Sequence, residues 1–252
     1  METASITTPL TRHQTIRAIE LITKEMSQKF GTKIIYKDES RLMKVIGRAM
    51  FWNKKFMTDV ITTMRGNIYV PNSFQGAVER IDKDNRKLRS YLTVLFHEYV
   101  HIEKRKKTLL PGLFELRYIT PQVYSLLGLV SLPLAVVNPW FILGAPLLLA
   151  ALPWPSKHRV EEEIRGYSAN IVCLHYVHGL PADKIVIQGF EYVFDGPSYY
   201  WMTGHPLTKG FFRGKLKTKV RRELYGVKVA VIDNKPIKHL HHIYRTLTEV
   251  KL

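Results

Sequence analysis

Two histidines with a glutamate between them, His97, Glu98 and His101, form the pattern H-E-x-x-H. Residues four apart on a helix lie on one face, one turn above the other, and an apolar run at residues 91–96 leads directly into the pattern. Two imidazoles in this arrangement can hold one Zn²⁺, and a glutamate beside them can face the water that the metal binds. The pattern therefore predicts a zinc site. A surface helix that matches by chance is the alternative.

A catalytic zinc ion usually has three protein ligands and one water, so a third donor is expected on a later element. The chain has one cysteine, Cys173, which excludes a disulfide framework and leaves histidine and carboxylate as the donors. Residues 161–163 are three glutamates near the start of a segment, residues 159–175, whose apolar positions have helical spacing. This run is the best source of the third ligand, and an acidic, solvated helix start is the alternative.

The three glutamates differ in where a helix would point them. At about 100° per residue, Glu163 lies next to one edge of the apolar stripe, Glu161 lies farther beyond the other edge, and Glu162 lies nearly opposite the stripe. A ligand must point toward the interior, so Glu163 is the predicted third ligand. Glu162 is the second candidate, because Gly166 and Ala169 would let its face of the helix pack closely.

Composition limits the class of protein. The 252 residues are 46% hydrophobic and 23% charged, which allows a folded core and argues against disorder. The net charge of +17, from 38 Lys and Arg against 21 Asp and Glu, implies an anionic partner such as lipid headgroups, nucleic acid or an acidic protein. Residues 1–5 lack the basic and apolar regions of a secretory signal, so we expect an intracellular rather than a secreted protein.

The residues before the H-E-x-x-H pattern predict helices and short strands. Thr11 can cap a helix over residues 12–30 that Gly31 ends, and Ser40 can cap a second helix that reaches about residue 50. The predicted strands cover residues 33–36, 56–64 and 68–71. This order of helix, strand, strand and H-E-x-x-H helix resembles the upper subdomain of the zincins, a class of zinc-dependent metallopeptidases.

The resemblance to the zincins implies an α+β fold with a small mixed sheet beside the H-E-x-x-H helix. It also implies that an edge strand of this sheet binds an extended peptide by adding it to the sheet. Residues 68–70 are where we expect that edge strand.

The segment at residues 118–156 contains no charged side chain. Asn138 and Pro139 break it near the middle, so each apolar arm is shorter than the roughly 20 residues of a membrane-spanning helix. The pattern predicts a membrane hairpin, spanning or re-entrant, and a buried helical hairpin or a hydrophobic lid is the alternative. By the positive-inside tendency, the basic residues at both ends would place the catalytic part on the cytoplasmic side. These residues are Lys104, Arg105, Lys106, Lys107 and Arg117 before the segment and Lys157, His158 and Arg159 after it.

A site of two histidines and one glutamate with H-E-x-x-H resembles the gluzincin branch of the zincins. The resemblance implies that His97, His101 and Glu163 hold Zn²⁺, and that Glu98 takes a proton from the bound water and passes it to the leaving amine. The order of H-E-x-x-H, apolar hairpin and glutamate-bearing helix also resembles the integral-membrane zinc proteases of the HtpX and CaaX-processing type.

Those membrane proteases carry Glu-x-x-x-Asp or Glu-x-x-Ala-Asp after the hairpin. Here the position four after Glu163 is Tyr167, and the position four after Glu162 is Gly166. The resulting Glu-x-x-Gly-Tyr resembles a Glu-x-x-Ala-Tyr variant found in small zincin-like proteins, some of them encoded by phages.

A gluzincin also needs a residue that stabilises the oxyanion of the transition state. The candidates are Tyr199, Tyr200 and His205 in an aromatic segment, of which Tyr200 and His205 are the predicted catalytic residues; an aromatic core is the alternative. His175 and His178 can imitate a metal pair, but a Gly-Leu-Pro sequence follows them, so we interpret them as capping the end of their helix.

The predicted fold is therefore α+β in three parts. Residues 1–117 form an upper zincin-like subdomain with the H-E-x-x-H helix, residues 118–156 form an inserted apolar hairpin, and residues 157–252 form a lower subdomain with the third-ligand helix and a basic C-terminal region. The predicted function is that of a membrane-associated zinc metallopeptidase acting on a protein or peptide. The alternatives are a zincin fold that no longer cleaves, and a basic module that binds nucleic acid or anionic lipid through residues 211–222.

Overall fold

The computed structural model is α+β, with helices predominating over one small mixed sheet. The chain divides into two compact units, one made of Met1–Thr108, Arg165–Ile187 and Leu224–Leu252, the other of Leu109–Ile164 and Gln188–Glu223. The structure describes residues 8–50, 53, 55–74, 85–108, 110, 112–180, 190, 193–196, 199, 201–204 and 213–225. The sequence of residues 225–232, Tyr-Gly-Val-Lys-Val-Ala-Val-Ile, also predicts a strand, but all of these residues except the first lie outside the described ranges.

Helix α1 (Arg12–Phe30) begins and ends where the sequence predicts. The Thr11 hydroxyl accepts a hydrogen bond from the backbone N–H of Gln14 (3.3 Å), and the Gln14 side chain accepts one from the backbone N–H of Thr11 (2.8 Å). This reciprocal pair satisfies two of the donors that a helix start leaves open. At the other end Gly31 takes the left-handed conformation, φ 66°, that terminates a helix at little cost for a glycine.

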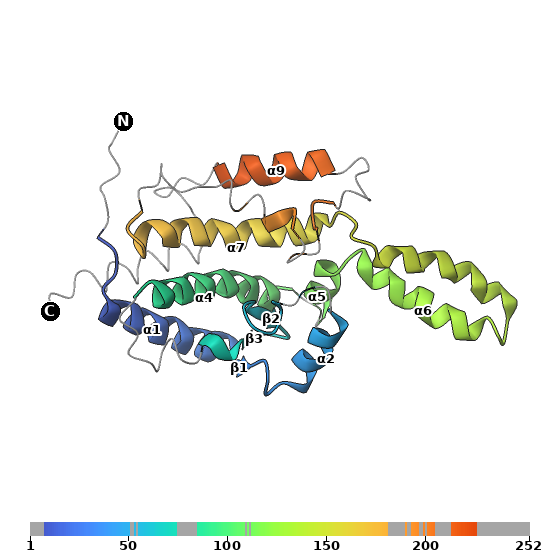
Figure 1. Ribbon diagram of the computed structural model, residues 1–252, viewed down its shortest axis with the longest axis horizontal. Coiled ribbons are helices and arrows are strands. Elements are labelled where there is room, and N and C mark those ends of the chain that lie inside the picture. The colour runs from blue at the N-terminus through green and yellow to red at the C-terminus, as the bar shows by residue number, and fades with distance from the viewer. Residues whose placement is uncertain are drawn as a thin grey trace. The chain divides into compact units, whose positions relative to one another are not determined.

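The core of the first unit forms between α1, α4 (Asn85–Lys106) and the later part of α7 (Lys157–Tyr176). Figure 1 shows α1 running alongside α4. The buried contacts come from the apolar faces of the three helices, including Ala18, Ile22 and Met26 of α1, Leu92, Leu95 and Phe96 of α4, and Val172 and Cys173 of α7. This packing fixes α4, the helix that carries H-E-x-x-H.

The sheet has the order β1-β3-β2 and mixes both strand directions. Strand β1 (Ile34–Tyr36) is parallel to β3 (Asn67–Val70), and β2 (Thr62–Met64) is antiparallel to it. Ile68 and Val70 join the core formed with α1 and α4, whereas Tyr69 joins a second cluster with Met43 of α2 (Arg41–Ala49). Successive β3 side chains thus point to opposite, covered faces.

The predicted edge strand at residues 68–70 is wrong, because β3 is the central strand of the described sheet. Its continuous apolar sequence, Ile68-Tyr69-Val70, is what a strand buried on both faces requires. The preceding strand is also shorter than predicted, since residues 55–59 form turns and only Thr62–Met64 pairs with β3. The outer strand that follows those turns is therefore β2.

The second unit contains the predicted hairpin. Helix α5 (Leu113–Tyr118) and the 3₁₀ helix η2 (Gln122–Tyr124) lead into α6 (Ser125–Leu134), and the chain returns as the 3₁₀ helix η3 (Pro139–Ala151). The predicted break at Asn138-Pro139 is confirmed: the Asn138 side chain accepts a hydrogen bond from the backbone N–H of Trp140 (3.1 Å) and caps η3. None of the described helices combines the length and the apolar character needed to cross a membrane.

Helix α7 is one continuous helix that begins in the second unit and continues in the first, because the division falls between Ile164 and Arg165. The Ser156 hydroxyl accepts a hydrogen bond from the backbone N–H of Arg159 (3.4 Å) and so caps its start. The three glutamates at residues 161–163 therefore lie in its first two turns.

Candidate metal centre

His97 and His101 lie one turn apart on α4, and both imidazoles are buried, with exposed fractions of 5% and 6%. Their ring centroids are 4.9 Å apart. Burying an imidazole costs free energy, because its polar nitrogens lose contact with water, and a hydrogen bond or a ligand must offset this cost. The two histidines of the pattern therefore face the interior and do not belong to a solvated helix surface.

Helix α7 packs directly against the His97 ring. A Cβ atom added at Gly166 would lie 2.4 Å from Cε1 and 2.5 Å from Nε2 of His97, closer than real Cβ contacts allow. The next residue, Tyr167, places its ring edge-on to the His97 ring, with centroids 5.1 Å apart and planes at 86°. Gly166 thus provides the space for the imidazole, and Tyr167 restricts its orientation.

Glu163 lies one turn before Gly166 and Tyr167 on the same helix and is only 2% exposed. One ligand atom from each of His97, His101 and Glu163 lies within 4.8 Å of the other two. The three positions of the Glu-x-x-Gly-Tyr sequence therefore have related roles: Glu163 contributes a carboxylate to the group, and the glycine and tyrosine hold one of its imidazoles.

Sequence reasoning missed Tyr118, whose hydroxyl donates a hydrogen bond to Oε1 of Glu163 at 2.5 Å. Tyr118 is itself fixed, because the Arg159 side chain donates to its backbone carbonyl (3.0 Å) and lies over its ring, with Cζ 5.3 Å from the centroid. The contact joins residues 45 positions apart across the hairpin, which no local pattern predicts. Tyr118 therefore orients the Glu163 carboxylate.

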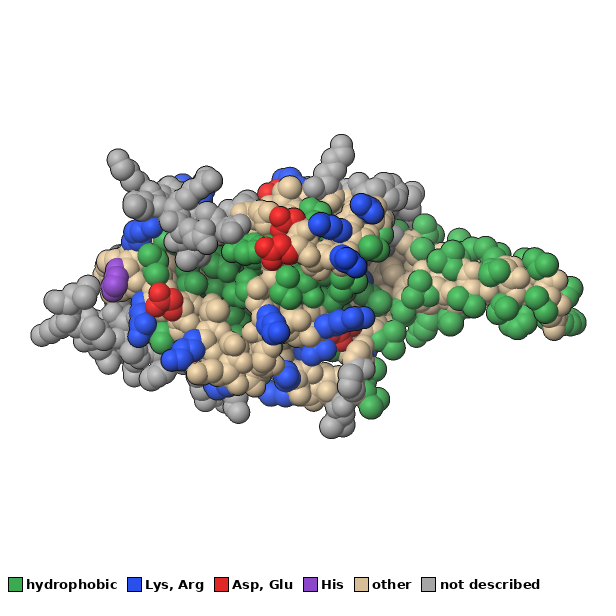
Figure 2. All heavy atoms as spheres, turned by 90° about the horizontal axis from the view of Figure 1, so that it is seen from below, with side chains coloured by type: hydrophobic (Ala, Val, Ile, Leu, Met, Phe, Trp, Pro, Cys, Tyr) green, Lys and Arg blue, Asp and Glu red, His purple; other side chains and the backbone are tan. Residues whose placement is uncertain are grey.

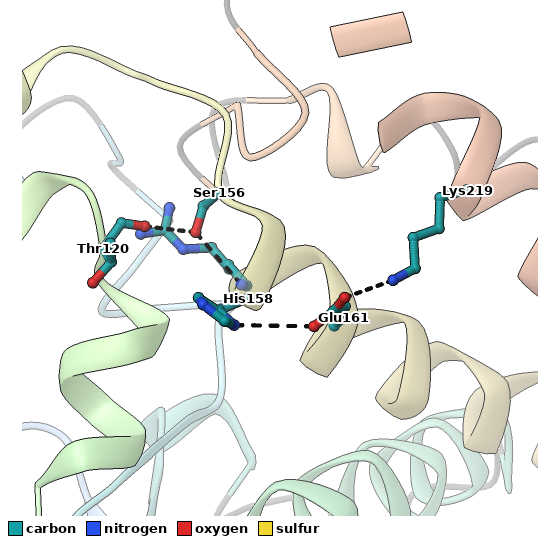
Figure 3. A network of polar contacts seen from close by, with 6 residues as sticks. Thr120, Ser156, His158, Glu161 and Lys219 are labelled. Atoms are coloured by element: carbon teal, nitrogen blue, oxygen red, sulfur yellow. Dashed lines mark hydrogen bonds and ion pairs between the residues drawn. The ribbon is translucent and has the colours of Figure 1, made fainter. Parts of the chain in front are cut away.

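The other two glutamates of the run are not part of the group among the described residues. Glu161 accepts a hydrogen bond from Lys219 (2.6 Å), and its other oxygen lies 4.0 Å from Nδ1 of His158 (Figure 3). Burial alone would raise the pKa of Glu161, but Lys219, Lys157 and His158 outweigh it and hold the pKa below its ordinary value. Glu162 is half-buried. The helical projection thus selects the same glutamate as the structure.

Glu98 is 6% exposed and lies next to His97 on α4. The hydroxyl of Thr63, on β2, donates a hydrogen bond to its Oε2 at 2.5 Å, so the outer strand of the sheet holds this carboxylate in one orientation. Lys37 is another buried charged side chain of this unit. It is 1% exposed and donates a hydrogen bond to the backbone carbonyl of Phe56 (2.6 Å). Burial lowers the pKa of Lys37 to about 8, against the opposing charge of Glu98.

The donor set fits a zinc ion. Two imidazole nitrogens and one carboxylate oxygen are a known combination for catalytic zinc, which leaves one coordination position for water or substrate. A carboxylate as buried as Glu163 is costly unless a positive charge or hydrogen bonds compensate it, and Tyr118 supplies one such bond. His97, His101 and Glu163 form a buried group that can hold a metal ion.

The predicted oxyanion residues Tyr200 and His205 lie outside the described residues. Tyr199 is described, and its backbone carbonyl accepts a hydrogen bond from Arg159 (3.3 Å). The second histidine pair is engaged elsewhere: Nδ1 of His175 is 2.9 Å from the Leu180 carbonyl, beyond the end of α7, and Nε2 of His178 is 3.2 Å from the Thr93 hydroxyl.

The basic segment at residues 211–222 falls largely on helix α9 (Arg213–Tyr225). Leu216, Val220 and Leu224 are buried along one side of this helix. Two of its lysines form ion pairs within the second unit, Lys217 with Asp195 (2.7 Å) and Lys219 with Glu161 (2.6 Å). Part of the positive charge of the segment is therefore neutralised by the protein itself.

Comparison of the chain with protein-family models, curated proteins and solved structures finds no match.

Proposed function

We propose that the protein is a zinc-dependent metallopeptidase. The observation that carries the proposal is the buried group of His97, His101 and Glu163, with Glu98 next to one of its histidines. Zinc bound to such a donor set lowers the pKa of water and polarises a carbonyl, which is the chemistry of peptide hydrolysis.

The protein's own residues would supply proton transfer and orientation. Glu98 accepts a proton from the attacking water and delivers it to the leaving amine, for which a carboxylate held in place is suited. Thr63 keeps the Glu98 carboxylate in one orientation through its 2.5 Å hydrogen bond. Tyr118 holds the Glu163 carboxylate in one orientation through its own hydrogen bond.

The substrate would bind as an extended chain along β2. This strand is an outer strand of the described sheet, and through Thr63 it contacts the proposed general base. Peptide added to a sheet edge gains main-chain hydrogen bonds independent of its sequence. The role that the sequence assigned to residues 68–70 therefore passes to residues 62–64.

An inactive zincin-like fold is the main alternative. A protein that only needed a folded scaffold would have no use for a buried glutamate oriented by a hydrogen bond next to a metal group, because burying a carboxylate costs free energy. Glu98 therefore favours the active enzyme.

The first test is the metal content of the purified protein by elemental analysis. We expect about one zinc per chain, as one three-ligand group requires, with loss in His97→Ala and weaker retention in Glu163→Gln. Glu162→Gln is the matched control, because it makes the same change one residue away and should keep full zinc content.

The second test is hydrolysis of an unstructured protein substrate such as casein. Glu98→Gln should keep its zinc and lose activity by about 10²–10⁴-fold, the usual contribution of a general base. A native protein without zinc, even after refolding in its presence, would contradict the metal centre. A zinc-loaded protein in which Glu98→Gln cleaves as well as the native chain would contradict the mechanism.

A further inference from the structure

The hairpin of α6 and η3 has its small side chains inside and its large apolar side chains outside, the reverse of a hairpin in a water-soluble protein. The residues that α6 buries are Gly128 and Ser131, whereas large apolar side chains face outward. Those of α6 lie at residues 126, 127, 129, 130, 132 and 134, and at about 100° per residue they occupy more than half of its circumference. Figure 2 shows hydrophobic side chains along the whole arm that the two helices form, at the right of the view.

Small residues allow the two helices to approach closely. A Cβ atom at Gly128 would lie 2.8 Å from the backbone nitrogen of Leu148, and one at Gly144 would lie 2.6 Å from the Ser131 side chain. Contact through glycine and serine, with the large side chains outside, is the packing that helices adopt in lipid, because lipid gives no hydrophobic reason to bury leucine between them.

The turn between the helices satisfies its own backbone donors. The N–H groups of residues 135–138 donate to the carbonyls of Ser131, Leu132, Pro133 and Leu134 at 2.9–3.3 Å. Pro139 has no N–H, and the N–H of Trp140 donates to the Asn138 side chain (3.1 Å). A hydrocarbon environment demands this, because each backbone group left unsatisfied there costs several kcal/mol.

The ends of the hairpin are joined and carry polar and basic groups. The Ser156 hydroxyl donates to the Thr120 carbonyl at 2.6 Å, which ties the segment after η3 to the segment before η2 (Figure 3). These joined ends form the base of the hairpin. Near the base lie the partly exposed aromatic residues Tyr124 and Trp154, and the exposed cations Arg117 and Lys157. Tyrosine, tryptophan and basic residues are the side chains that favour the headgroup region of a bilayer.

We propose that the hairpin inserts tip-first into a lipid bilayer with anionic headgroups, with residues 136–140 in the hydrocarbon and the base among the headgroups. The 13 residues of η3 extend for about 26 Å at 2.0 Å per residue, against a hydrocarbon core about 30 Å thick. The hairpin therefore enters the bilayer and returns to the side from which it came. A protein partner covers one face, whereas lipid surrounds an inserted element, as the exposed arc of α6 requires.

The test is flotation of the purified full-length protein with vesicles of phosphatidylcholine alone and of phosphatidylcholine mixed with phosphatidylglycerol. We expect binding that is stronger with phosphatidylglycerol and weakens with salt, as for basic residues near an anionic surface. The fluorescence of Trp140 should shift to the blue and be quenched by brominated acyl chains, and this change should disappear in Trp140→Phe.

The decisive variant is the double change Val136→Asp and Val137→Asp. These side chains are 89% and 83% exposed, so the change should leave folding and zinc content unaltered. Two carboxylates in the hydrocarbon should lower vesicle binding at least about tenfold. Val45→Asp on α2 is the matched control, because Val45 is 61% exposed outside the hairpin and the variant should bind like the native protein.

Each other outcome overturns the proposal. Absence of vesicle binding would exclude a lipid partner, and a stable dimer in solution without vesicle binding would assign the hairpin to self-association. Binding that survives the double aspartate change would place the contact outside the hairpin. Equal binding to neutral and anionic vesicles would contradict the proposal, because it specifies anionic headgroups. Because zinc content is measured separately, failure of the peptidase proposal leaves this test unaffected.

Discussion

Polar residues ordinarily lie on the surface of a protein and large apolar residues inside it. The metal group departs from this arrangement by burying polar residues, and the hairpin departs from it by exposing apolar ones. At the metal group, two histidines and a glutamate are buried among apolar residues, with exposed fractions of 2–6%. In the hairpin, valine and tryptophan side chains are exposed by 77–89% near the turn. Polar groups inside and apolar groups outside both cost free energy in water.

The difference between the two regions indicates which kind of partner would stabilise each one. Buried imidazoles and a carboxylate are stabilised by a cation, and an exposed apolar helix pair is stabilised by lipid. The packing residues differ accordingly: Gly166 lets an imidazole approach a helix, whereas Gly128 and Gly144 let two helices approach each other. The comparison predicts that variants at the metal group change metal binding, and that variants in the hairpin change only its contact with lipid.

Among variants that keep the proposed ligands and Glu98, the largest effect is expected for Gly166→Ala. The new Cβ would lie 2.4 Å from the His97 ring, so the imidazole or the helix must shift. We expect zinc affinity to fall by about 10–100-fold, as for residues that orient a ligand, and the free energy of unfolding without metal to fall by about 1–3 kcal/mol. Competition with a fluorescent zinc chelator and denaturant unfolding measure the two effects.

Gly214→Ala is the control for this variant. Gly214 is also helical, in α9, but a Cβ there meets no atom within 4 Å. Alanine is the better helix former by up to about 1 kcal/mol, so this variant should be as stable as the native protein or more so, with unchanged zinc affinity. Native-like zinc affinity in Gly166→Ala would show that His97 is not held by α7.

A smaller effect is expected for Tyr118→Phe, which removes only the hydroxyl that donates to Glu163 at 2.5 Å. Zinc affinity should fall by about tenfold, because the carboxylate loses the hydrogen bond that orients it. Tyr124→Phe, which removes the hydroxyl of a half-exposed tyrosine of η2, should leave the affinity unchanged. If both variants bind zinc like the native protein, Tyr118 has no positioning role and only packs beside the site.

Local sequence patterns predicted the features that depend on one helix or one turn. The spacing of His97 and His101, the inward direction of Glu163, the Thr11 cap and the Asn138-Pro139 break all follow from helix periodicity or local hydrogen bonds. Tyr118 and Thr63 were missed because they reach Glu163 and Glu98 from elements 45 and 35 residues away, and sequence spacing does not encode such contacts.

The position of β3 shows the same limit for the fold. The sequence predicts a strand at residues 68–70, but the place of this strand in the sheet depends on its pairing with β1. Strand β1 is separated from it in the sequence by α2 and β2. Likewise, the apolar content of residues 118–156 was evident in the sequence, whereas the inward direction of Gly128 and the outward direction of its leucine neighbours required the structure.

The smallest effect is expected for Val137→Ala, and it tests the comparison most directly. Val137 is 83% exposed, so in the absence of lipid its truncation should change the free energy of unfolding by less than about 0.5 kcal/mol. Val172→Ala makes the same change in the α7 core, at an exposure of 0%, and should cost about 2 kcal/mol. Equal losses in the two variants would mean that the hairpin is covered in solution by another copy of the chain. Unequal losses, combined with weaker vesicle binding by Val137→Ala, would mean that the apolar surface of the hairpin stabilises contact with lipid and not the fold.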